Sequence, residues 1–200
     1  MKKIAIFLFE GAELFEIASF TDIFGWNNVV GLKEYRDIKL ETISYKESIK
    51  CTWGGEIKVE EVITEENIEK FFDYDVLIIP GGFGKANFFE GKNNKFFKKL
   101  IKYFSENNKI IVAICSAVIK LLESTYIRGK KVTTYLLDNK RYFNQLKNYN
   151  VIPIEEEIVE DNNLFTCSGP GNALELSFRL LEKLTSNENV NIIKDNMFLK

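Results

Sequence analysis

Short runs of apolar residues alternate with segments of helical periodicity along most of this chain, and this alternation limits the possible folds more than any other feature. The apolar runs predict strands at 2–9, 37–45, 74–80, 109–114 and 130–137, with a further strand that starts at 163. The helical periodicity predicts helices at 11–28, 64–72, 93–108 and 138–149, and a long helix that ends at 184. Such alternation predicts a doubly wound α/β fold, in which helices cover both faces of a mostly parallel sheet.

The chain is expected to form one domain over residues 1–200, because this length buries a substantial core but is short for two domains. No Pro/Ser-rich linker and no internal repeat divides it. The segment 54–62 predicts a short hairpin or an edge strand.

Charge and hydropathy give expectations about partners and compartment. The chain has 27 Lys and Arg against 29 Asp and Glu, so no basic surface argues for nucleic acid. The apolar run after the N-terminal lysines is stopped by Glu10, short of the ~7–15 residues of a signal core, and no run reaches the ~18 residues of a membrane span. We therefore expect a soluble, cytoplasmic protein with no membrane partner.

Cysteine and histidine usage narrows the chemistry. Cys51, Cys115 and Cys167 are an odd number at wide spacing, which favours reduced thiols over a disulfide framework or a zinc site. The chain contains no histidine, so it has no imidazole to act as a base or a metal ligand. Ser-His and Cys-His chemistry is excluded unless another chain supplies the histidine, and no metal site is expected.

Cys115 stands where a predicted strand meets a predicted helix. The sequence AICSA at 113–117 has the form of a nucleophile elbow with cysteine in place of serine. A thiol at a helix N-terminus is expected to have a pKa below its usual ~8.5. If the two strand ends adjoin, the N–H groups of Ser116 and Gly82 could bind an oxyanion. The alternative is that Cys115 is a small, buried apolar residue.

Two further features lie near predicted strand ends. In the helix at 11–28, Glu16 lies on the flank of an apolar face formed by Phe20, Ile23 and Phe24, where a carboxylate needs a partner. The sequence IIPGGFG at 78–84 lacks the Lys-Ser/Thr pair of a nucleotide-binding loop. It predicts either a tight turn that brings backbone amides close to a ligand or a simple turn.

Five segments together resemble the ThiJ/PfpI family. They are EGAELFE at 10–16, DVLIIPGGFG at 75–84, IVAICSA at 111–117, GKKVTTY at 129–135 and TCSGPGNALELSF at 166–178. The resemblance covers nearly the whole chain and implies a flavodoxin-like fold of the class I glutamine amidotransferase type. It also implies a homodimer. Trp26 and Trp53 are candidates for the pocket mouth or the dimer interface, and core packing is an equal alternative.

The resemblance assigns roles to particular residues. It implies that Cys115 faces Glu16, and that a protonated Glu16 donates a hydrogen bond to the sulfur. Oxyanion contacts would fall to the Gly82 and Ser116 amides, while Gly81 and Tyr135 would border the pocket. Tyr135 occupies the segment in which the family often has a histidine, and this difference argues against a Cys-His peptidase.

Three kinds of function follow from the resemblance. The first is an enzyme that acts on small reactive carbonyls, glyoxalase-like or deglycase-like, and that needs neither metal nor cofactor. The alternative is a redox or stress-response protein in which Cys115 is oxidised to the sulfinate. A third possibility is isonitrile-hydratase-like chemistry, although that branch usually has an aspartate where this chain has Glu16.

Overall fold

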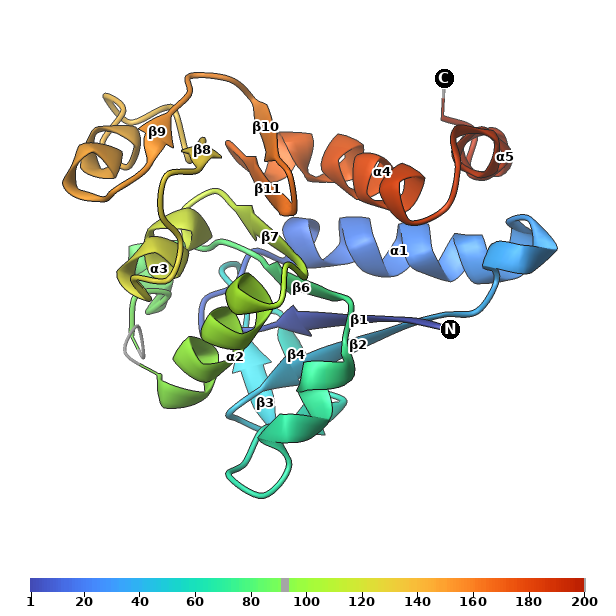
Figure 1. Ribbon diagram of the computed structural model, residues 1–200, viewed down its shortest axis with the longest axis horizontal. Helices are drawn as coiled ribbons and strands as arrows, with labels where there is room; N and C mark the ends of the chain where they lie inside the picture. Colours follow the sequence, from blue (N-terminus) through green and yellow to red (C-terminus); the bar gives the residue numbers. More distant parts are fainter. Residues whose placement is uncertain (91–93, 200) are drawn as a thin grey trace.

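The computed structural model describes residues 1–90 and 94–199 and centres on a seven-stranded sheet (Figure 1). In spatial order its strands are β10 (Ile158–Asp161), β11 (Leu164–Cys167), β7 (Ile110–Ile114), β6 (Val76–Ile79), β1 (Lys2–Phe7), β2 (Ile38–Ser44) and β5 (Glu61–Val62). Neighbouring strands run parallel except β10 and β11, which are antiparallel. The sheet is therefore mostly parallel, as the sequence predicts.

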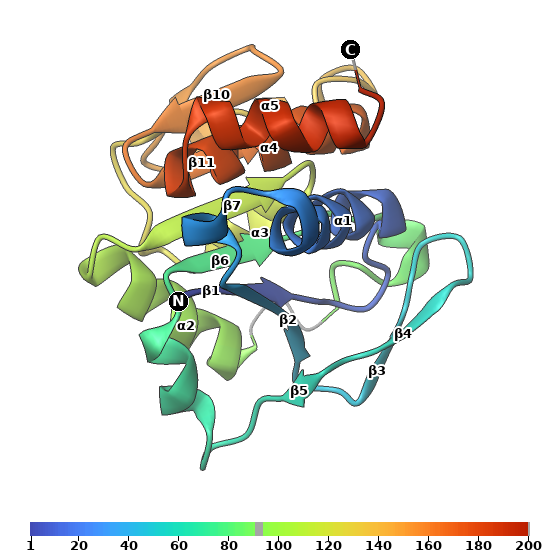
Figure 2. The ribbon, with the colours of Figure 1, turned by 90° about the vertical axis from the view of Figure 1, so that its right-hand side faces the viewer.

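Helices cover both faces of this sheet. On one face lie α1 (Leu14–Val30), α4 (Ala173–Leu184) and α5 (Asn187–Asn196), and on the other lie α2 (Lys95–Glu106) and α3 (Ala117–Glu123) (Figures 1 and 2). This arrangement confirms the predicted doubly wound α/β fold.

Strand β1 explains why the apolar runs are continuous. Ile4 and Ile6 point into the core beneath α1 and α4, whereas Ala5 and Phe7 point into the core beneath α2 and α3. Successive side chains of a strand alternate between faces, so a strand covered on both sides needs an apolar residue at every position.

Several smaller elements complete the chain. Strands β3 (Ser48–Lys50) and β4 (Glu56–Lys58) form an antiparallel hairpin, and β5 is an edge strand of the main sheet, as the segment 54–62 predicts. Strands β8 (Lys131–Val132) and β9 (Ile152–Pro153) pair outside the main sheet. The 3-10 helices are η1 (Lys33–Tyr35), η2 (Ile68–Asp73), η3 (Gly84–Ala86), η4 (Phe143–Asn148) and η5 (Pro170–Asn172).

The predicted helix at 64–72 is wrong. The chain turns at Thr64 and then forms only the 3-10 helix η2. The cause is Asn67, whose side chain accepts a hydrogen bond from the Thr64 N–H at 2.8 Å and donates one to the Val62 carbonyl at 2.8 Å. Asn side chains that bond to nearby backbone in this way compete with an α-helix.

The sequence also predicts more strand and helix over residues 130–149 than the structure contains. Only β8 is a strand, because the next two threonines bond elsewhere: the Thr133 N–H donates to Thr166 Oγ1, and Thr134 Oγ1 donates to the Cys115 carbonyl. The predicted helix at 138–149 is reduced to η4. Helix α2 begins after Asn94, whose side chain caps the Phe97 N–H at 3.0 Å, and the predicted start at residue 93 lies outside the described residues.

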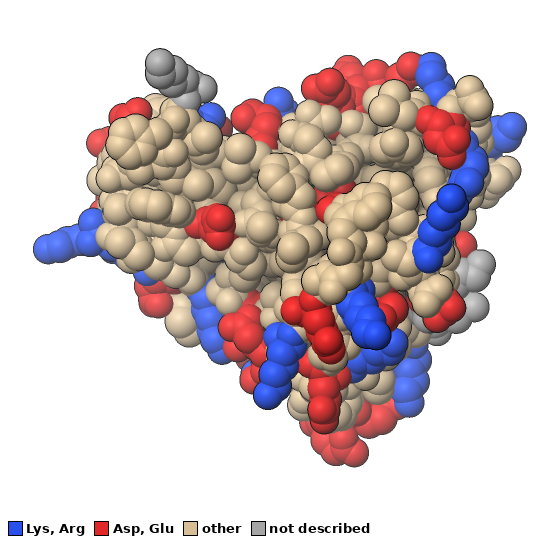
Figure 3. Space-filling model, turned by 180° about the vertical axis from the view of Figure 1, so that it is seen from behind, with Lys and Arg blue, Asp and Glu red and all other residues tan. Residues whose placement is uncertain are grey.

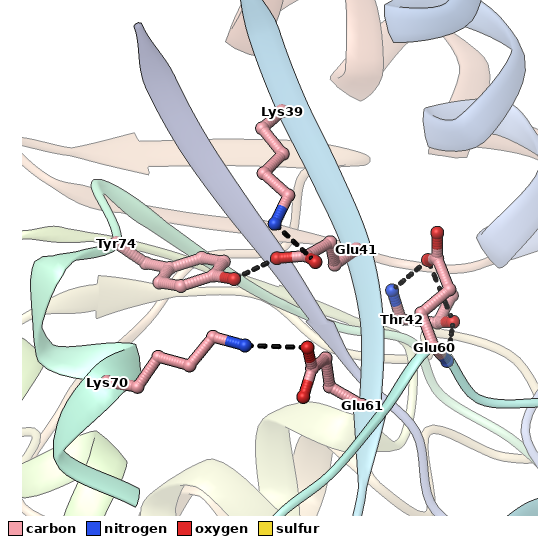
Figure 4. Close-up of polar contacts among 7 residues, drawn as sticks. All are labelled: Lys39, Glu41, Thr42, Glu60, Glu61, Lys70 and Tyr74. Atoms are coloured by element: carbon pink, nitrogen blue, oxygen red, sulfur yellow. Dashed lines mark hydrogen bonds and ion pairs between the residues drawn. The ribbon is translucent and has the colours of Figure 1, made fainter. Parts of the chain in front are cut away.

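Polar contacts join η2 to the edge of the sheet (Figure 4). Glu41 on β2 accepts hydrogen bonds from Lys39 and from the Tyr74 hydroxyl, and Lys70 pairs with Glu61 on β5 at 2.6 Å. Burial raises the pKa of Glu41, but the hydrogen bonds from Lys39 and Tyr74 outweigh burial and lower it. Glu41 is therefore held as a carboxylate under the sheet edge.

Charged side chains of both signs are mixed on the face seen in Figure 3. They lie next to one another over its lower part, while the region above carries fewer charges. Among the ion pairs of the chain is that between Lys46 and Glu10, at 2.9 Å. Among the described residues, no helix is long and apolar enough to cross a membrane.

Candidate functional site

Cys115 lies between the end of β7 and the first turn of α3, at the predicted junction. Its backbone is in the left-handed region, with φ of 54°. Such a conformation costs a residue with a side chain roughly 1–2 kcal/mol. Two hydrogen bonds hold it: the Cys115 N–H donates to the Cys167 carbonyl at 2.8 Å, and Thr134 Oγ1 donates to the Cys115 carbonyl at 2.6 Å.

The left-handed backbone determines where the thiol points. Along β7, Val112 and Ile114 face the core beneath α1, and Ala113 faces the opposite core. Strict alternation would turn residue 115 toward the side of Ala113. Cys115 instead packs in the same core as Ile114. The turn therefore directs the sulfur toward α1.

Glu16 in the first turn of α1 is fully buried. Its Oε2 accepts a hydrogen bond from the Gly81 N–H at 2.5 Å, while Oε1 has no hydrogen-bond partner among the described residues. Burial raises the pKa of Glu16 to about 8, the Gly81 N–H acts against this increase, and the Glu13 carboxylate adds to it. At neutral pH Glu16 is mainly a protonated carboxylic acid.

Gly81 lies between the thiol and the acid. A Cβ atom at this position would lie 2.9 Å from the Cys115 Cβ, 3.2 Å from Glu16 Oε2 and 2.7 Å from the Ile114 carbonyl oxygen. A residue with a side chain does not fit there. The glycine thus allows the ends of β6 and β7 and the start of α1 to approach one another closely enough for Cys115 and Glu16 to interact.

The expectation of a lowered thiol pKa is contradicted. Burial raises the pKa of the Cys115 thiol, and Glu16 raises it further when ionised, whereas hydrogen bonds to Ser116 lower it only in part. The sequence indicates the helix N-terminus but not that the thiol is only 9% exposed. Burial therefore outweighs the short helix α3, and the resting sulfur is a thiol.

Gly82 and Ser116 lie side by side, as expected, but the Gly82 N–H bonds to the Ser116 side chain and is not left open for a ligand. The Gly82 N–H donates to Ser116 Oγ at 3.1 Å, and the same hydroxyl donates to the Gly82 carbonyl at 2.7 Å. The Gly82 amide is thus already paired within the protein. The Ser116 N–H instead bonds toward the Cys115 sulfur and lowers the pKa of the thiol in part.

A pocket of about 820 Å³ opens beside these residues. It is lined by Thr52, Trp53, Phe83, Gly84, Lys85, Ala86, Tyr135, Asp138, Arg141 and Tyr142. Cys115 is not part of its lining, but Phe83 follows the Gly82 that bonds Ser116, and Tyr135 follows the Thr134 that bonds the Cys115 carbonyl. The pocket therefore lies near the backbone of the turn that holds Cys115.

Sequence reasoning identified some pocket residues and missed others. Tyr135 borders the pocket, and Trp53 stands at its mouth, 75% exposed and packed 5.4 Å from the Phe83 ring. Lys85 and Arg141 were missed, because cations in segments predicted as loop and helix look like ordinary surface residues. Among the described residues, no group of three or more metal-binding side chains could hold an ion.

Comparisons with known proteins identify the family and the fold. The model of the DJ-1/PfpI family matches residues 2–183. Protein dj-1beta of Drosophila melanogaster is 26% identical over 189 residues, covering 94% of this chain and 92% of its own length. The crystal structure of Drosophila melanogaster DJ-1beta matches with a TM-score of 0.82 at 24% identity, over 100% of this chain and 98% of that one. Oxidized DJ-1 of Toxoplasma gondii matches with a TM-score of 0.75 at 19% identity, over 100% and 99%.

Proposed function

This chain belongs to the DJ-1/PfpI family, and from that premise we propose that it is a cofactor-independent cysteine enzyme acting on small reactive carbonyls, glyoxalase-like or deglycase-like. One observation carries the proposal. Cys115 is held in a left-handed turn that directs its thiol toward a buried, protonated Glu16. A nucleophile and a proton donor are thus preorganised in one dry site.

The two residues divide the chemistry between them. The Cys115 sulfur attacks the aldehyde carbon and forms a C–S bond, while the thiol proton passes by way of Glu16 to the carbonyl oxygen, giving a hemithioacetal. With a 2-oxoaldehyde, ionised Glu16 then takes the proton from the first carbon and returns it to the second, while the hydroxyl proton on the oxygen of the first carbon passes to the oxygen of the second, which yields the thioester of a 2-hydroxy acid. Water releases the acid and restores the thiol.

The pKa of Glu16 is suited to general acid-base catalysis near neutral pH. A carboxyl group with a pKa of about 8 is present in both protonation states near neutral pH, so it can both give and take a proton. The raised pKa of the thiol is no obstacle, because its proton is transferred during the attack. The low exposure of Cys115 favours a small carbonyl over a bulky one.

The proposal is tested by turnover of methylglyoxal to lactate. Cys115→Ala should abolish turnover, and Glu16→Gln should reduce kcat by roughly 100-fold or more, the usual range for loss of a general acid-base. Cys51→Ala, which removes another buried thiol, should keep the wild-type rate. Equal turnover by Cys115→Ala and wild type would show that Cys115 is not the nucleophile.

A second candidate is a redox sensor in which Cys115 is oxidised to the sulfinate. It is favoured by the unpartnered Oε1 of Glu16, since a protonated carboxyl group there could donate to a sulfinate oxygen. The relative from Toxoplasma gondii has a structure described as oxidized. Oxidation of Cys115 by low peroxide, with no turnover of any carbonyl, would favour this candidate.

We place this chemistry in the cytoplasm. All three cysteines are free thiols. Free thiols persist in a reducing compartment and tend to pair in an oxidising one. Fractionation of cells with an antibody to the protein tests the location, and recovery outside the cytoplasm would contradict it.

A further inference from the structure

Cys167 is a second thiol at this site that the proposed chemistry does not use. It ends β11, is fully buried, and packs in the same core as Cys115 and Ile114. Its sulfur makes only a weak contact with the Gly169 carbonyl, at 3.6 Å. A free thiol this close to a reactive thiol could form a disulfide with it.

The strand register brings the two cysteines to neighbouring positions. Cys167 lies opposite Ile114 in the parallel ladder of β11 and β7, and the Cys115 N–H donates to the Cys167 carbonyl at 2.8 Å. Adjacent strands are ~4.8 Å apart and one residue adds ~3.3 Å along the strand, which puts the two Cα atoms about 6 Å apart. Disulfides span Cα distances of about 4.4–6.8 Å.

The left-handed turn supplies the orientation as well as the distance. A regular strand would turn residue 115 away from the face on which Cys167 lies. The φ of 54° keeps both side chains in the core beneath α1. Glu16 acts on both sulfurs: its charge raises the pKa of each thiol, after the larger effect of burial.

Cys51 is not part of this group. Its pKa is raised by burial and then by the charges of Glu13 and Glu10, not by Glu16. Its N–H bonds the Gly55 carbonyl at 2.6 Å, in the loop that leads to β4. Cys51 is a buried cysteine in a different environment and is therefore a matched control.

We propose that Cys115 and Cys167 form a redox-active dithiol, in which Cys167 traps the sulfenic acid of Cys115 as an intramolecular disulfide. This inference rests on the proposed reactivity of Cys115. Of these two cysteines Cys115 is 9% exposed and Cys167 is fully buried, so a hydroperoxide meets Cys115 first and Cys167 is reached only from within the protein.

The steps balance with a hydroperoxide as the two-electron oxidant. The Cys115 sulfur, deprotonated as it reacts, attacks the outer peroxide oxygen, the O–O bond breaks, and water or an alcohol leaves. The Cys167 sulfur then attacks the Cys115 sulfur, an S–S bond forms and the S–O bond breaks. The hydroxyl leaves as water with the proton of Cys167, transferred by Glu16.

The experiment treats the reduced full-length chain with one and, in a parallel sample, with two equivalents of hydrogen peroxide, because the disulfide consumes one equivalent and the sulfinate two. Remaining thiols are then alkylated under denaturing conditions, and masses of the intact protein and of its peptides are measured without reductant. Wild type should lose two hydrogen atoms, alkylate only at Cys51, and yield a linked peptide pair containing Cys115 and Cys167. Cys51→Ala should form the same linked pair.

The variant Cys167→Ala should instead gain two oxygen atoms at Cys115, the sulfinate, because the sulfenic acid is no longer trapped. Cys167→Ser repeats this test with a smaller change in volume, and the wild-type measurement does not depend on whether either variant folds. Wild-type sulfinate with Cys167 still alkylated would overturn the dithiol but leave the reactive Cys115. A Cys115 that peroxide does not oxidise would contradict both proposals.

Discussion

Glu16 is the residue whose burial should govern how stability depends on pH. Its pKa rises from 4.5 to about 8 on folding, so between these values the native state holds a proton that the unfolded state has lost. The free energy of unfolding should therefore decrease as pH rises through this window and level off above it. With about 1.4 kcal/mol for each pKa unit, the decrease over the whole window is on the order of 5 kcal/mol.

Glu16→Gln should remove this dependence, because the amide resembles the protonated acid and does not titrate. Urea unfolding at a series of pH values from 5 to 8 measures the effect. Glu34→Gln, which removes an exposed carboxyl group, should keep the wild-type slope. Equal slopes in wild type and Glu16→Gln would show that Glu16 ionises as readily in the folded chain as in the unfolded one.

For single residues, the sequence predicts which side chains lie close together, but it does not predict their pKa values or their hydrogen-bond partners. The junction position of Cys115 and the helical spacing of Glu16 are visible in the pattern, and the structure brings both against Gly81. The raised thiol pKa and the Gly82–Ser116 pair depend on burial and on side-chain rotation in three dimensions. The left-handed turn that brings Cys167 alongside leaves no periodic signal.

The 3-10 helix η2 is joined to the sheet by the buried hydroxyl of Tyr74, and this contact should stabilise the fold. The Tyr74 side chain, 1% exposed, donates to Glu41 on β2 just after η2 ends. Tyr74→Phe would leave part of a buried carboxylate unpaired and should lower the free energy of unfolding by about 2 kcal/mol. Urea unfolding at pH 7 measures the loss. Tyr126→Phe, at a more exposed tyrosine, is the control, and equal losses in the two variants would contradict the role of the Glu41 contact.

The elements that the sequence predicts well are those buried on both sides. Strands β1, β6 and β7 read as continuous apolar runs because helices cover both faces of the sheet. The segments that were predicted wrongly, 64–72 and 130–149, lie at the rim, where side-chain hydrogen bonds to the backbone decide the conformation. One Asn or Thr changes such a segment without altering its hydrophobic pattern.

For the whole molecule, the topology explains why the site lies where it does. Cys115 and Gly81 follow the carboxyl ends of β7 and β6, Cys167 is the last residue of β11, and Glu16 lies in the first turn of the helix that follows β1. In doubly wound sheets these ends meet along one edge, which is where ligands bind. The order of strands and helices in the sequence therefore predicts that the site lies at the carboxyl ends of the strands. Close packing around Gly81 determines which side chains contact one another there.

The last prediction concerns assembly, and we propose that the chain forms a homodimer through α1. Phe15, Trp26 and Val29 are 54%, 39% and 69% exposed and lie on one side of this helix, with the exposed Asp22 between Phe15 and Trp26. A helix that is apolar on both sides is expected to be covered on both, and a single stripe can pack against its own copy about a two-fold axis. Light scattering after size-exclusion chromatography should give the mass of two chains for wild type and of one chain for Trp26→Glu. Ile152→Glu, at an exposed isoleucine on β9, should remain a dimer, and a monomeric wild type at high concentration would contradict the assignment.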